Sequence, residues 1–383
     1  MATDKRIDRV LKLKEGETAC PATAKSEIRP SLPECQLSLW VSSMTEISAS
    51  PAGPVDQMRM MLAGHVIAQS LHVLALLGIP DLIESGHRGL DDLVAATGMH
   101  PPSLHRMLTT LASLGVLTEI ADGEFGLTPL GATLRSDVKG SLRDQALFET
   151  SGEVWAAWGS LVYSLRSGQP SFTSVNKSPL FSYLAEHPEA GAVFNRFMTA
   201  QSNLQNAAII QNYDFSGVRT LVDVGGGQGA TLGAILGRYP EMRGTLFDLP
   251  KVVANTPLIQ TPEFAGRCDV IGGSALEGVP KGADIYVVKR VIMSFSDEDS
   301  LTILRNCRAA MRTHSRILVI DPMVPDGIKA HYNRLTDLLM LVVPGGRCRP
   351  EREFRKLFDA AGLSITRVID TGSSNFILEG TIA

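Results

Sequence analysis

The stretch "LVDVGGGQGATLGAIL", residues 221–236, decides the fold of this 383-residue chain. It opens with the apolar run of a buried strand and closes with apolar residues at helical spacing. Between the two stand Gly225, Gly226, Gly227 and Gly229, which let the backbone turn tightly and approach a ligand closely. No Gly-Lys-Ser/Thr follows, so the turn is not a P-loop. The stretch therefore predicts a strand, a ligand-binding turn and a helix.

A second strand is predicted to end in "FDLP", residues 247–250. Asp248 there can accept hydrogen bonds from both ribose hydroxyls of an adenosine ligand. A dinucleotide would need a helix N-terminus that meets a pyrophosphate, whereas S-adenosyl-L-methionine carries no phosphate. Its positive sulfonium favours acidic residues near the turn, where Asp223 lies, and Lys289 could meet its carboxylate. We therefore predict S-adenosyl-L-methionine as the cofactor.

Short β-branched runs alternate with helical stretches throughout residues 216–383. Five of these runs are candidate strands: "RTLVDVG", "GTLFDLP", "CDVIGG", "DIYVVKR" and "RILVIDP". The tail "ITRVIDTGSSNFILEG" predicts a terminal hairpin. Such alternation is typical of an α/β fold with a doubly wound, Rossmann-like parallel sheet.

Residues 54–135 have the pattern of a winged helix. Two predicted helices joined by a turn precede two short strands, which are connected by Asp122-Gly123. A second helix that reads DNA would offer Lys, Arg, Asn or Gln, but this one offers only His105 and Arg106. We therefore expect no nucleic-acid partner, and we expect this apolar helix to serve dimerisation.

The flanking segments differ in character. Residues 1–53 have mixed charge and little periodicity, which predicts a disordered leader. Residues 136–215 are expected to form helices that connect the two domains and contribute to a substrate pocket. Phe194, Phe197 and Met198 fall on one stripe there, either as core or as the lining of an aromatic-sized pocket.

Composition places the chain among ordinary globular proteins, with 44% hydrophobic and 20% charged residues. A formal net charge of −4 argues against a polyanionic partner. The five cysteines are scattered without a Cys/His cluster, so we expect neither disulfides nor a metal. No apolar run reaches the roughly 20 residues that span a bilayer, and no secretory signal opens the sequence. We therefore expect a cytoplasmic protein without a membrane partner.

The chain resembles the caffeic-acid and hydroxyindole type of S-adenosylmethionine-dependent O-methyltransferases, in their bacterial and fungal form, over about residues 56–382. The segments that carry the resemblance are, in order, "LVDVGGGQGA", "LFDLP", "SDEDSLTILRNCRAAM", "DLLMLVVPGGRCRPEREF" and "AGLSITRVIDT". It implies a winged-helix dimerisation domain over residues 54–135 and a class I methyltransferase domain over residues 216–383. It also implies a homodimer in which each subunit helps to close the other's cleft.

Residue roles carry over by position. The resemblance implies that the cofactor is bound by residues at strand ends, namely Asp223, Gly225, Gly226, Gly227, Asp248, Leu249, Ser274, Ala275 and Lys289. We expect a small-molecule substrate in a pocket formed by Arg196, Phe197, Leu339, Met340, Val343 and Cys348. The expected catalytic residues are Met293, Asp321 and Arg290.

The sequence departs from the family at several of these positions. The family usually has a His as general base where Met293 stands, and a Glu that orients this His where Cys348 stands. A third family acid is kept as Asp321. An Asp that usually meets the adenine falls on Ser274, and an Asn of the substrate pocket falls on Leu339.

The missing base restricts the chemistry. A phenol of pKa about 10 is ionised to roughly one part in a thousand at pH 7, and losing base assistance costs on the order of 10²–10⁴ in rate. We therefore predict a methyltransferase of small aromatic or polyketide-like natural products in which proximity methylates a nitrogen, an activated carbon or an ionised hydroxyl. Two alternatives stay open. One is a cofactor-retaining enzyme (pericyclase, dehydratase, hydroxylase or decarboxylase), and the other is an inactive subunit that serves as a partner.

Overall fold

The structure is a computed structural model that describes residues 53–254, 256–328 and 331–383. The chain divides into two compact units, residues 1–62 and 63–383. In the first unit, α3 (Pro54–Leu62) is the described helix. The predicted disordered leader lies outside the described residues apart from Gly53, so it stays a prediction.

The predicted winged helix is present at the start of the second unit. Its helices are α4 (Gly64–Leu76), α5 (Ile79–Glu84), α6 (Leu90–Thr97) and α7 (Pro101–Ser113). The wing is an antiparallel pair, β1 (Leu117–Ala121) and β2 (Glu124–Leu127). Gly123 turns between the two strands in the left-handed region, at φ 69°, which favours glycine.

The apolar face of α7 has a different role from the predicted one. Leu104, Leu108 and Leu111 follow helical spacing and are buried in the core of the winged helix, together with Phe125 from the wing. Because this face already packs within its own subunit, it is not available to form a dimer contact. The apolar residues that suggested a dimer contact therefore belong to the core of their own subunit, and a part of α7 in dimerisation stays a prediction.

A helical segment follows, as predicted for residues 136–215. Its helices, after the short α8 (Pro129–Ala132), are α9 (Arg143–Glu149), α10 (Gly152–Gly159), α11 (Leu161–Ser167), α12 (Ser171–Asn176), α13 (Leu180–Glu186) and α14 (Pro188–Asn212). Buried residues of these helices, such as Phe148, Phe172 and Phe197, form one apolar cluster with Val342 and Val343.

A seven-stranded sheet forms the rest of the unit. The strands are β3 (Thr220–Val224), β4 (Arg243–Asp248), β5 (Cys268–Gly272), β6 (Ile285–Lys289), β7 (Arg316–Pro322), β8 (Leu363–Asp370) and β9 (Asn375–Ile382). Their spatial order is β5-β4-β3-β6-β7-β9-β8, parallel from β5 to β7 and antiparallel in the β8–β9 hairpin. All five predicted strands and the hairpin are confirmed. The strand order reverses between β3 and β6, which opens a crevice at their carboxyl ends.

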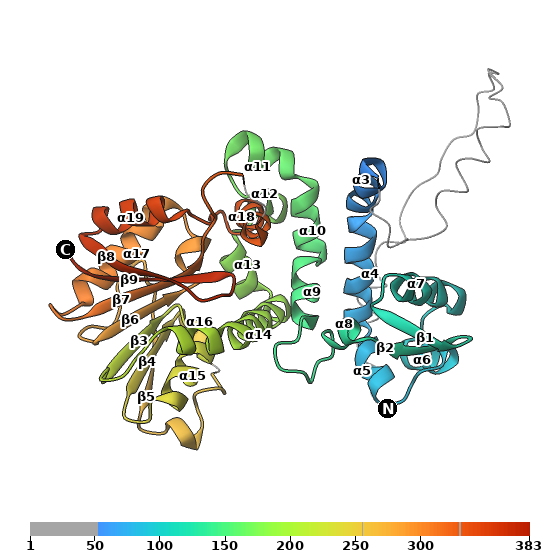
Figure 1. Cartoon of the computed structure of the whole chain (residues 1–383), viewed down its shortest axis with the longest axis horizontal. Coiled ribbons are helices and arrows are strands. Elements are labelled where there is room, and N and C mark those ends of the chain that lie inside the picture. Colours follow the sequence, from blue (N-terminus) through green and yellow to red (C-terminus); the bar gives the residue numbers. More distant parts are fainter. Residues whose placement is uncertain (1–52, 255, 329–330) are drawn as a thin grey trace. The chain divides into compact units, whose positions relative to one another are not determined.

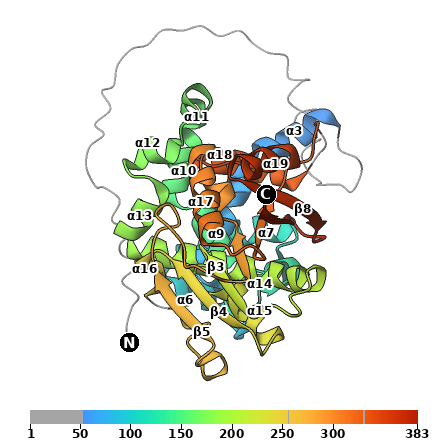
Figure 2. The ribbon, with the colours of Figure 1, turned by 90° about the vertical axis from the view of Figure 1, so that its left-hand side faces the viewer.

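Helices cover both faces of this sheet (Figures 1 and 2). Leu221, Ile285 and Val287 pack toward α14, α15 (Ala230–Arg238) and α16 (Pro250–Val253). Val222 and Val288 pack toward α17 (Asp297–Ala310) and α19 (Glu351–Ala360) on the opposite face. Since side chains alternate along a strand, polar residues at strand ends are assigned to one face or the other by their position.

Three further elements complete the described part of the chain. They are the 3-10 turns η1 (Pro262–Phe264) and η2 (Ile292–Ser294) and the helix α18 (Tyr332–Val342). No single helix among the described residues is long and apolar enough to cross a membrane, and only α3 and α4 pass such a test as a pair.

Candidate active site

The glycine turn after β3 lets a ligand approach its backbone closely. Gly225 and Gly227 lie in the left-handed region, at φ 68° and 61°, and the Gly225 amide donates to the Phe247 carbonyl at 2.7 Å. A Cβ on Gly226 would lie 2.5 Å from the side chain of Leu246 and 2.6 Å from that of Asp223. No side chain fits there without displacing its neighbours. The backbone of the turn therefore stays accessible to a ligand at these glycines, as the sequence predicted.

Asp223 and Lys289 form a buried charged pair beside this turn. By alternation both lie on the α14 face of the sheet, where the Lys289 Nζ donates to the Ser202 Oγ at 2.8 Å. Neither carboxylate oxygen of Asp223 has a hydrogen-bond partner of good geometry among the described residues, although the Leu232 amide lies close enough to lower its pKa slightly. Burial raises the pKa of Asp223 to about 7, and nearby Lys289 opposes this shift. Burial also lowers the pKa of Lys289 to about 7, with Arg290 adding to the effect.

This pair fits S-adenosylmethionine. Buried polar atoms normally have partners, and the two bare oxygens of Asp223 are the kind of exception that a ligand explains. A carboxylate suits the positive sulfonium and ammonium groups, and the ammonium of Lys289 suits the carboxylate of the same ligand. When bound, the cofactor supplies an electrophilic methyl group to the site.

Asp248 is fixed at the end of β4. Its Oδ2 accepts from the Gly227 amide at 2.8 Å and its Oδ1 from the Leu249 amide at 2.6 Å. Burial raises the pKa of Asp248 and these two amides lower it. Each oxygen keeps a lone pair for a ribose hydroxyl, so the predicted role is compatible with these bonds. Leu249 itself is 42% exposed.

The segment after β5 contains the other two predicted cofactor residues. The Ser274 Oγ accepts from the Leu276 amide at 3.3 Å, and the Ala275 carbonyl accepts from the Asn306 side chain at 2.8 Å. These bonds order the segment at the same carboxyl edge of the sheet. The roles of Ser274 and Ala275 in binding adenine stay predictions.

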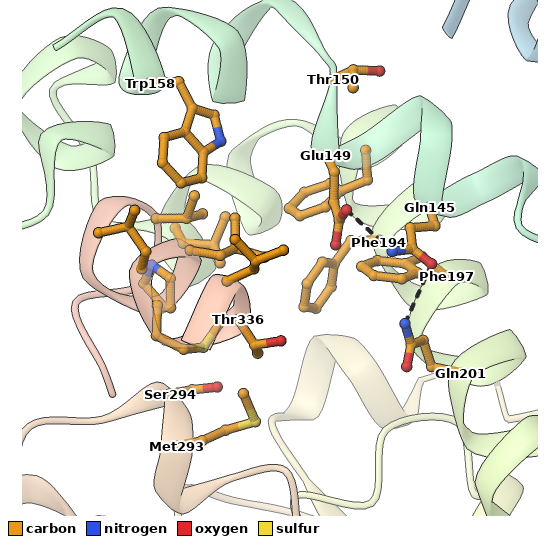
Figure 3. A pocket seen from close by; sticks show the side chains of 18 of the residues that line it. Gln145, Glu149, Thr150, Trp158, Phe194, Phe197, Gln201, Met293, Ser294 and Thr336 are labelled. Atoms are coloured by element: carbon orange, nitrogen blue, oxygen red, sulfur yellow. Dashed lines mark hydrogen bonds between the residues drawn. The ribbon is translucent and has the colours of Figure 1, made fainter. Parts of the chain in front are cut away.

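A cavity of about 830 Å³ lies among α4, α9, α10, α13, α14, α18 and the turn after β6. Its volume is within the usual range for small-molecule sites. Most of its wall is apolar or aromatic (Figure 3). The apolar and aromatic lining residues include Phe148, Trp155, Trp158, Phe181, Phe194, Phe197, Met198, Met293, Leu335, Leu338, Leu339, Met340 and Val343.

This lining decides between the two interpretations of the stripe on α14. Phe194, Phe197 and Met198 line the cavity, so the pocket interpretation holds for all three. Phe197 is at the same time buried against Phe148, with ring centroids 5.9 Å apart. The stripe is therefore both core and pocket wall.

Met293 is held firmly in the cavity wall by the turn η2. Its amide donates to the Asp321 Oδ2 at 2.9 Å, and its carbonyl accepts from the Arg347 amide at 2.8 Å. Its side chain packs with Met340 and Cys348. A thioether cannot take a proton at neutral pH, so this position shapes the pocket and does not act as a base.

Arg349 braces the same turn from behind. Its guanidinium, 0% exposed, donates to the Ile292 carbonyl at 2.9 Å and the Phe295 carbonyl at 3.1 Å. It also pairs with the Asp297 Oδ1 at 2.6 Å and reaches the Ser300 Oγ at 3.3 Å. Sequence reasoning missed this role, because the burial of an arginine cannot be read from charge pattern.

Arg290 contributes positive charge to the cavity wall. It has left-handed backbone geometry, at φ 56°, which is uncommon for a residue with a side chain. Its buried Nε has no hydrogen-bond partner among the described residues. Burial lowers the pKa of Arg290, and the carboxylates of Asp321 and Glu149 raise it.

Three of the predicted catalytic and substrate residues lie outside the cavity wall. Arg196 was expected in the substrate pocket, but its side chain is 45% exposed and pairs with Asp144 at 2.7 Å. The reason is helical geometry, since Arg196 points toward α9 while its neighbour Phe197 points inward. Cys348 and Asp321 lie behind the wall, where burial raises their pKa values to about 12 and about 7. Their contact with a substrate stays a prediction.

The polar part of the wall was not predicted from the sequence. Gln145 and Glu149 on α9 and Gln201 on α14 line the cavity and are joined by hydrogen bonds (Figure 3). The spacing of Gln145 and Glu149, four residues apart, placed them on one helical face and was the only local signal.

Comparison with known proteins agrees with this geometry. A family model for the O-methyltransferase domain matches residues 158–364, and one for the O-methyltransferase dimerisation domain matches residues 60–137. The chain belongs to the O-methyltransferase family. The recognised family, its class I methyltransferase fold and the dimerisation domain are thereby confirmed, and so is S-adenosylmethionine as the cofactor of the family.

Relatives of this O-methyltransferase-family enzyme include both O- and N-methyltransferases. It is 38% identical over 338 residues to a phenazine O-methyltransferase of Lysobacter antibioticus, covering 88% of this chain and 99% of that protein. It is 33% identical over 311 residues to the phenazine-1-carboxylate N-methyltransferase of Pseudomonas aeruginosa, covering 81% and 92%. The solved O-methyltransferase of neocarzinostatin biosynthesis, with S-adenosylmethionine and 2-hydroxy-5-methyl naphthoic acid, is 30% identical. That match has a TM-score of 0.73 and covers 83% of this chain and 96% of that one.

Proposed function

We propose that this enzyme methylates a nitrogen or an acidic hydroxyl of a small aromatic or polyketide-like natural product, using S-adenosylmethionine and no histidine at the usual position. The observation that carries this proposal is the position of Met293 in the wall of a largely apolar cavity that several aromatic side chains line. The cavity is next to the cofactor residues, because wall residues Arg290 and Gln201 directly adjoin Lys289 and Ser202 in sequence. An acceptor held there needs no imidazole if its reacting atom has a free lone pair.

Nitrogen is favoured as acceptor on chemical grounds. An aromatic nitrogen carries its lone pair at neutral pH, whereas a phenol of pKa about 10 must first lose a proton. The relative from Pseudomonas aeruginosa is an N-methyltransferase by name, and the one from Lysobacter antibioticus is an O-methyltransferase of a phenazine. Both names support a flat polycyclic acceptor, which suits a cavity lined by Trp155, Trp158, Phe181 and Phe194.

A homodimer is part of the proposal. The match of residues 60–137 to a dimerisation domain supports it. Helix α4, within that range, also contributes His65 and Ala68 to the cavity wall. Light scattering of the purified protein should give twice the mass of one chain, 2 × 41.2 kDa, whereas a monomer would contradict this part.

The proposal is tested with labelled S-adenosylmethionine and three matched acceptors of phenazine size. One carries a ring nitrogen or amine, one a hydroxyl already ionised at pH 7, and one an ordinary phenol. We expect transfer to the first two and a rate lower by roughly 10²–10⁴ with the phenol. Cofactor binding without transfer to any acceptor would contradict methyl transfer.

The same Met293 wall also supports a second candidate, the cofactor-retaining enzyme. A site that presents no proton acceptor at this turn could use the positive charge of the bound sulfonium only as an electrostatic element. This candidate predicts a product that forms only when the cofactor is present and leaves the cofactor at its starting concentration. Mass spectrometry of product and cofactor in the same incubation separates the two candidates.

A further inference from the structure

The cavity wall contains one carboxylate. Among the described residues that line the cavity, Glu149 is the only acid, and it ends α9 at the wall (Figure 3). Met293 and Ser294 belong to a different wall, on the turn after β6. An acceptor in the cavity can therefore meet the pocket-shaping thioether on one side and a carboxylate on another.

A chain of amides holds this carboxylate in place. The Gln205 Nε2 donates to the Gln201 Oε1 at 3.3 Å, and the Gln201 Nε2 donates to the Gln145 Oε1 at 3.4 Å. The Gln145 Nε2 then donates to the Glu149 Oε2 at 3.1 Å. All three bonds point the same way, so each amide polarises the next and the chain ends on the carboxylate. Among the described residues nothing donates to the Glu149 Oε1, which leaves that oxygen for a ligand.

The electrostatic surroundings suit a proton acceptor. Burial raises the pKa of Glu149 above its ordinary value, while the hydrogen bond from Gln145 and the charge of Arg290 lower it. The elements packed against α9 carry other titratable groups with partners of their own. His72 of α4 contacts Thr150, Arg196 of α14 pairs with Asp144, and Glu153 of α10 accepts from the Tyr183 hydroxyl. His65 of α4 lines the cavity. A base becomes more effective as its pKa approaches the working pH, provided that it stays ionised there.

We propose that the Oε1 of Glu149 accepts the proton that the acceptor loses, in place of a base at the turn after β6. This inference rests on the proposed function and narrows its substrate class to aromatic acceptors whose reacting nitrogen carries a hydrogen. As the acceptor atom bonds to the methyl carbon and the carbon–sulfur bond breaks, the acceptor's proton moves to the carboxylate. The carboxylic acid then releases the proton to water.

The decisive variant is Glu149→Gln, which keeps size and hydrogen bonding but cannot take a proton. With an N–H acceptor, kcat/KM at neutral pH should fall by about 10²-fold or more while KM changes little. The rising limb of the wild-type pH profile should disappear. With a matched acceptor that is already ionised, the rate should stay equal or rise, because no proton has to leave.

The matched control is Glu153→Gln on α10. Glu153 accepts from the Tyr183 hydroxyl at 3.0 Å and does not line the cavity, so its variant should keep the wild-type rate and pH profile. Calorimetry with S-adenosylhomocysteine should show unchanged affinity in both variants, which excludes misfolding as the cause.

A binding experiment gives a second readout that does not depend on turnover. An N–H acceptor that donates to Glu149 stabilises its ionised form, so binding should release protons at a pH on the rising limb. Calorimetry of the wild-type complex with S-adenosylhomocysteine, in two buffers of different ionisation enthalpy, measures that release, and Glu149→Gln should abolish it.

The outcomes separate this inference from the proposed function. Transfer by the wild type with an unchanged rate, pH profile and proton release in Glu149→Gln would overturn the inference alone. A loss of rate that affects the ionised acceptor equally would show a structural role and would also overturn it. No transfer by the wild type to any acceptor would remove the proposed function and the inference together.

Discussion

Asp223→Asn should stabilise the ligand-free protein and weaken its hold on the cofactor. The Asp223 carboxylate is 1% exposed, and neither oxygen has a hydrogen-bond partner of good geometry among the described residues. Burial raises its pKa from 3.8 to about 7 in spite of the nearby Lys289. Above neutral pH the folded ligand-free protein therefore ionises this group only at a cost in free energy, which a residue selected only for stability would not impose.

The magnitude follows from the pKa shift. Raising the pKa of Asp223 from 3.8 to about 7 corresponds to roughly 4 kcal/mol between the folded and unfolded states. Because the folded state holds the proton more tightly, the cost is absent below pH 3.8, grows toward pH 7 and is complete above pH 7. Asp223→Asn removes this cost, but a buried Asn amide without hydrogen-bond partners itself costs about 1–3 kcal/mol. We therefore expect Asp223→Asn to raise the free energy of unfolding by about 1–3 kcal/mol at pH 8 and not at pH 4.

Cofactor affinity should change in the opposite direction. A hydrogen bond to a charged group contributes about 1.5–3 kcal/mol, so Kd for S-adenosylmethionine should rise by roughly 10- to 150-fold. Urea unfolding at the two pH values and calorimetry with the cofactor measure the two effects. Asp269→Asn, an exposed position on β5, is the matched control and should change neither. If Asp223→Asn lowered stability and left affinity unchanged, Asp223 would be a structural residue and this reasoning would fail.

Three further substitutions test the glycine turn, the support of the turn after β6 by Arg349, and the absence of a base at Met293. Gly226→Ala should abolish measurable cofactor binding in calorimetry, because its Cβ would meet Leu246 at 2.5 Å. Gly237→Ala on α15 should bind normally, because its Cβ would meet only the Glu263 side chain, at an ordinary contact distance of 3.5 Å. Arg349→Met should lower the free energy of unfolding in urea by about 3 kcal/mol, since it leaves the Ile292 and Phe295 carbonyls without their donor. A loss below about 1 kcal/mol would contradict the bracing role. Met293→His should raise kcat/KM toward an ordinary phenol by about tenfold or more above pH 6.5, because an imidazole supplies a base. An unchanged rate would mean that the reacting oxygen lies away from this wall.

The parts of the molecule that the sequence predicted well depend on short stretches of chain. The turn at Gly225–Gly227 requires only its own backbone geometry, and Asp248 follows one strand later at the same sheet edge. The alternation of apolar runs predicts strands and helices, because burial on both faces of a parallel sheet demands it. The same reasoning places Asp223 and Lys289 on one face, since each stands at a definite strand position.

The parts that the sequence predicted poorly depend on contacts between distant segments. Arg196 and Phe197 are neighbours in sequence, yet one pairs with Asp144 on the surface and the other lines the cavity. Their order on the helix does not reveal which direction faces the pocket until α9 is in place. The bond from Gln201 to Gln145 spans 56 residues, so no local pattern predicts the amide chain that ends on the cavity carboxylate.

The construction of the turn after β6 argues against an inactive cleft. Its backbone is held by Asp321 at the Met293 amide, by Arg347 at the Met293 carbonyl and by Arg349 at the Ile292 carbonyl. The Met293 thioether held in this way cannot transfer a proton, but it does define the shape of the cavity wall. Because wall shape and proton acceptance are separate tasks, a carboxylate on another wall can perform the second while this turn performs the first. If the turn only packed a core, loosening it would cost stability alone, whereas a pocket wall that is loosened also loses discrimination between acceptors of different size.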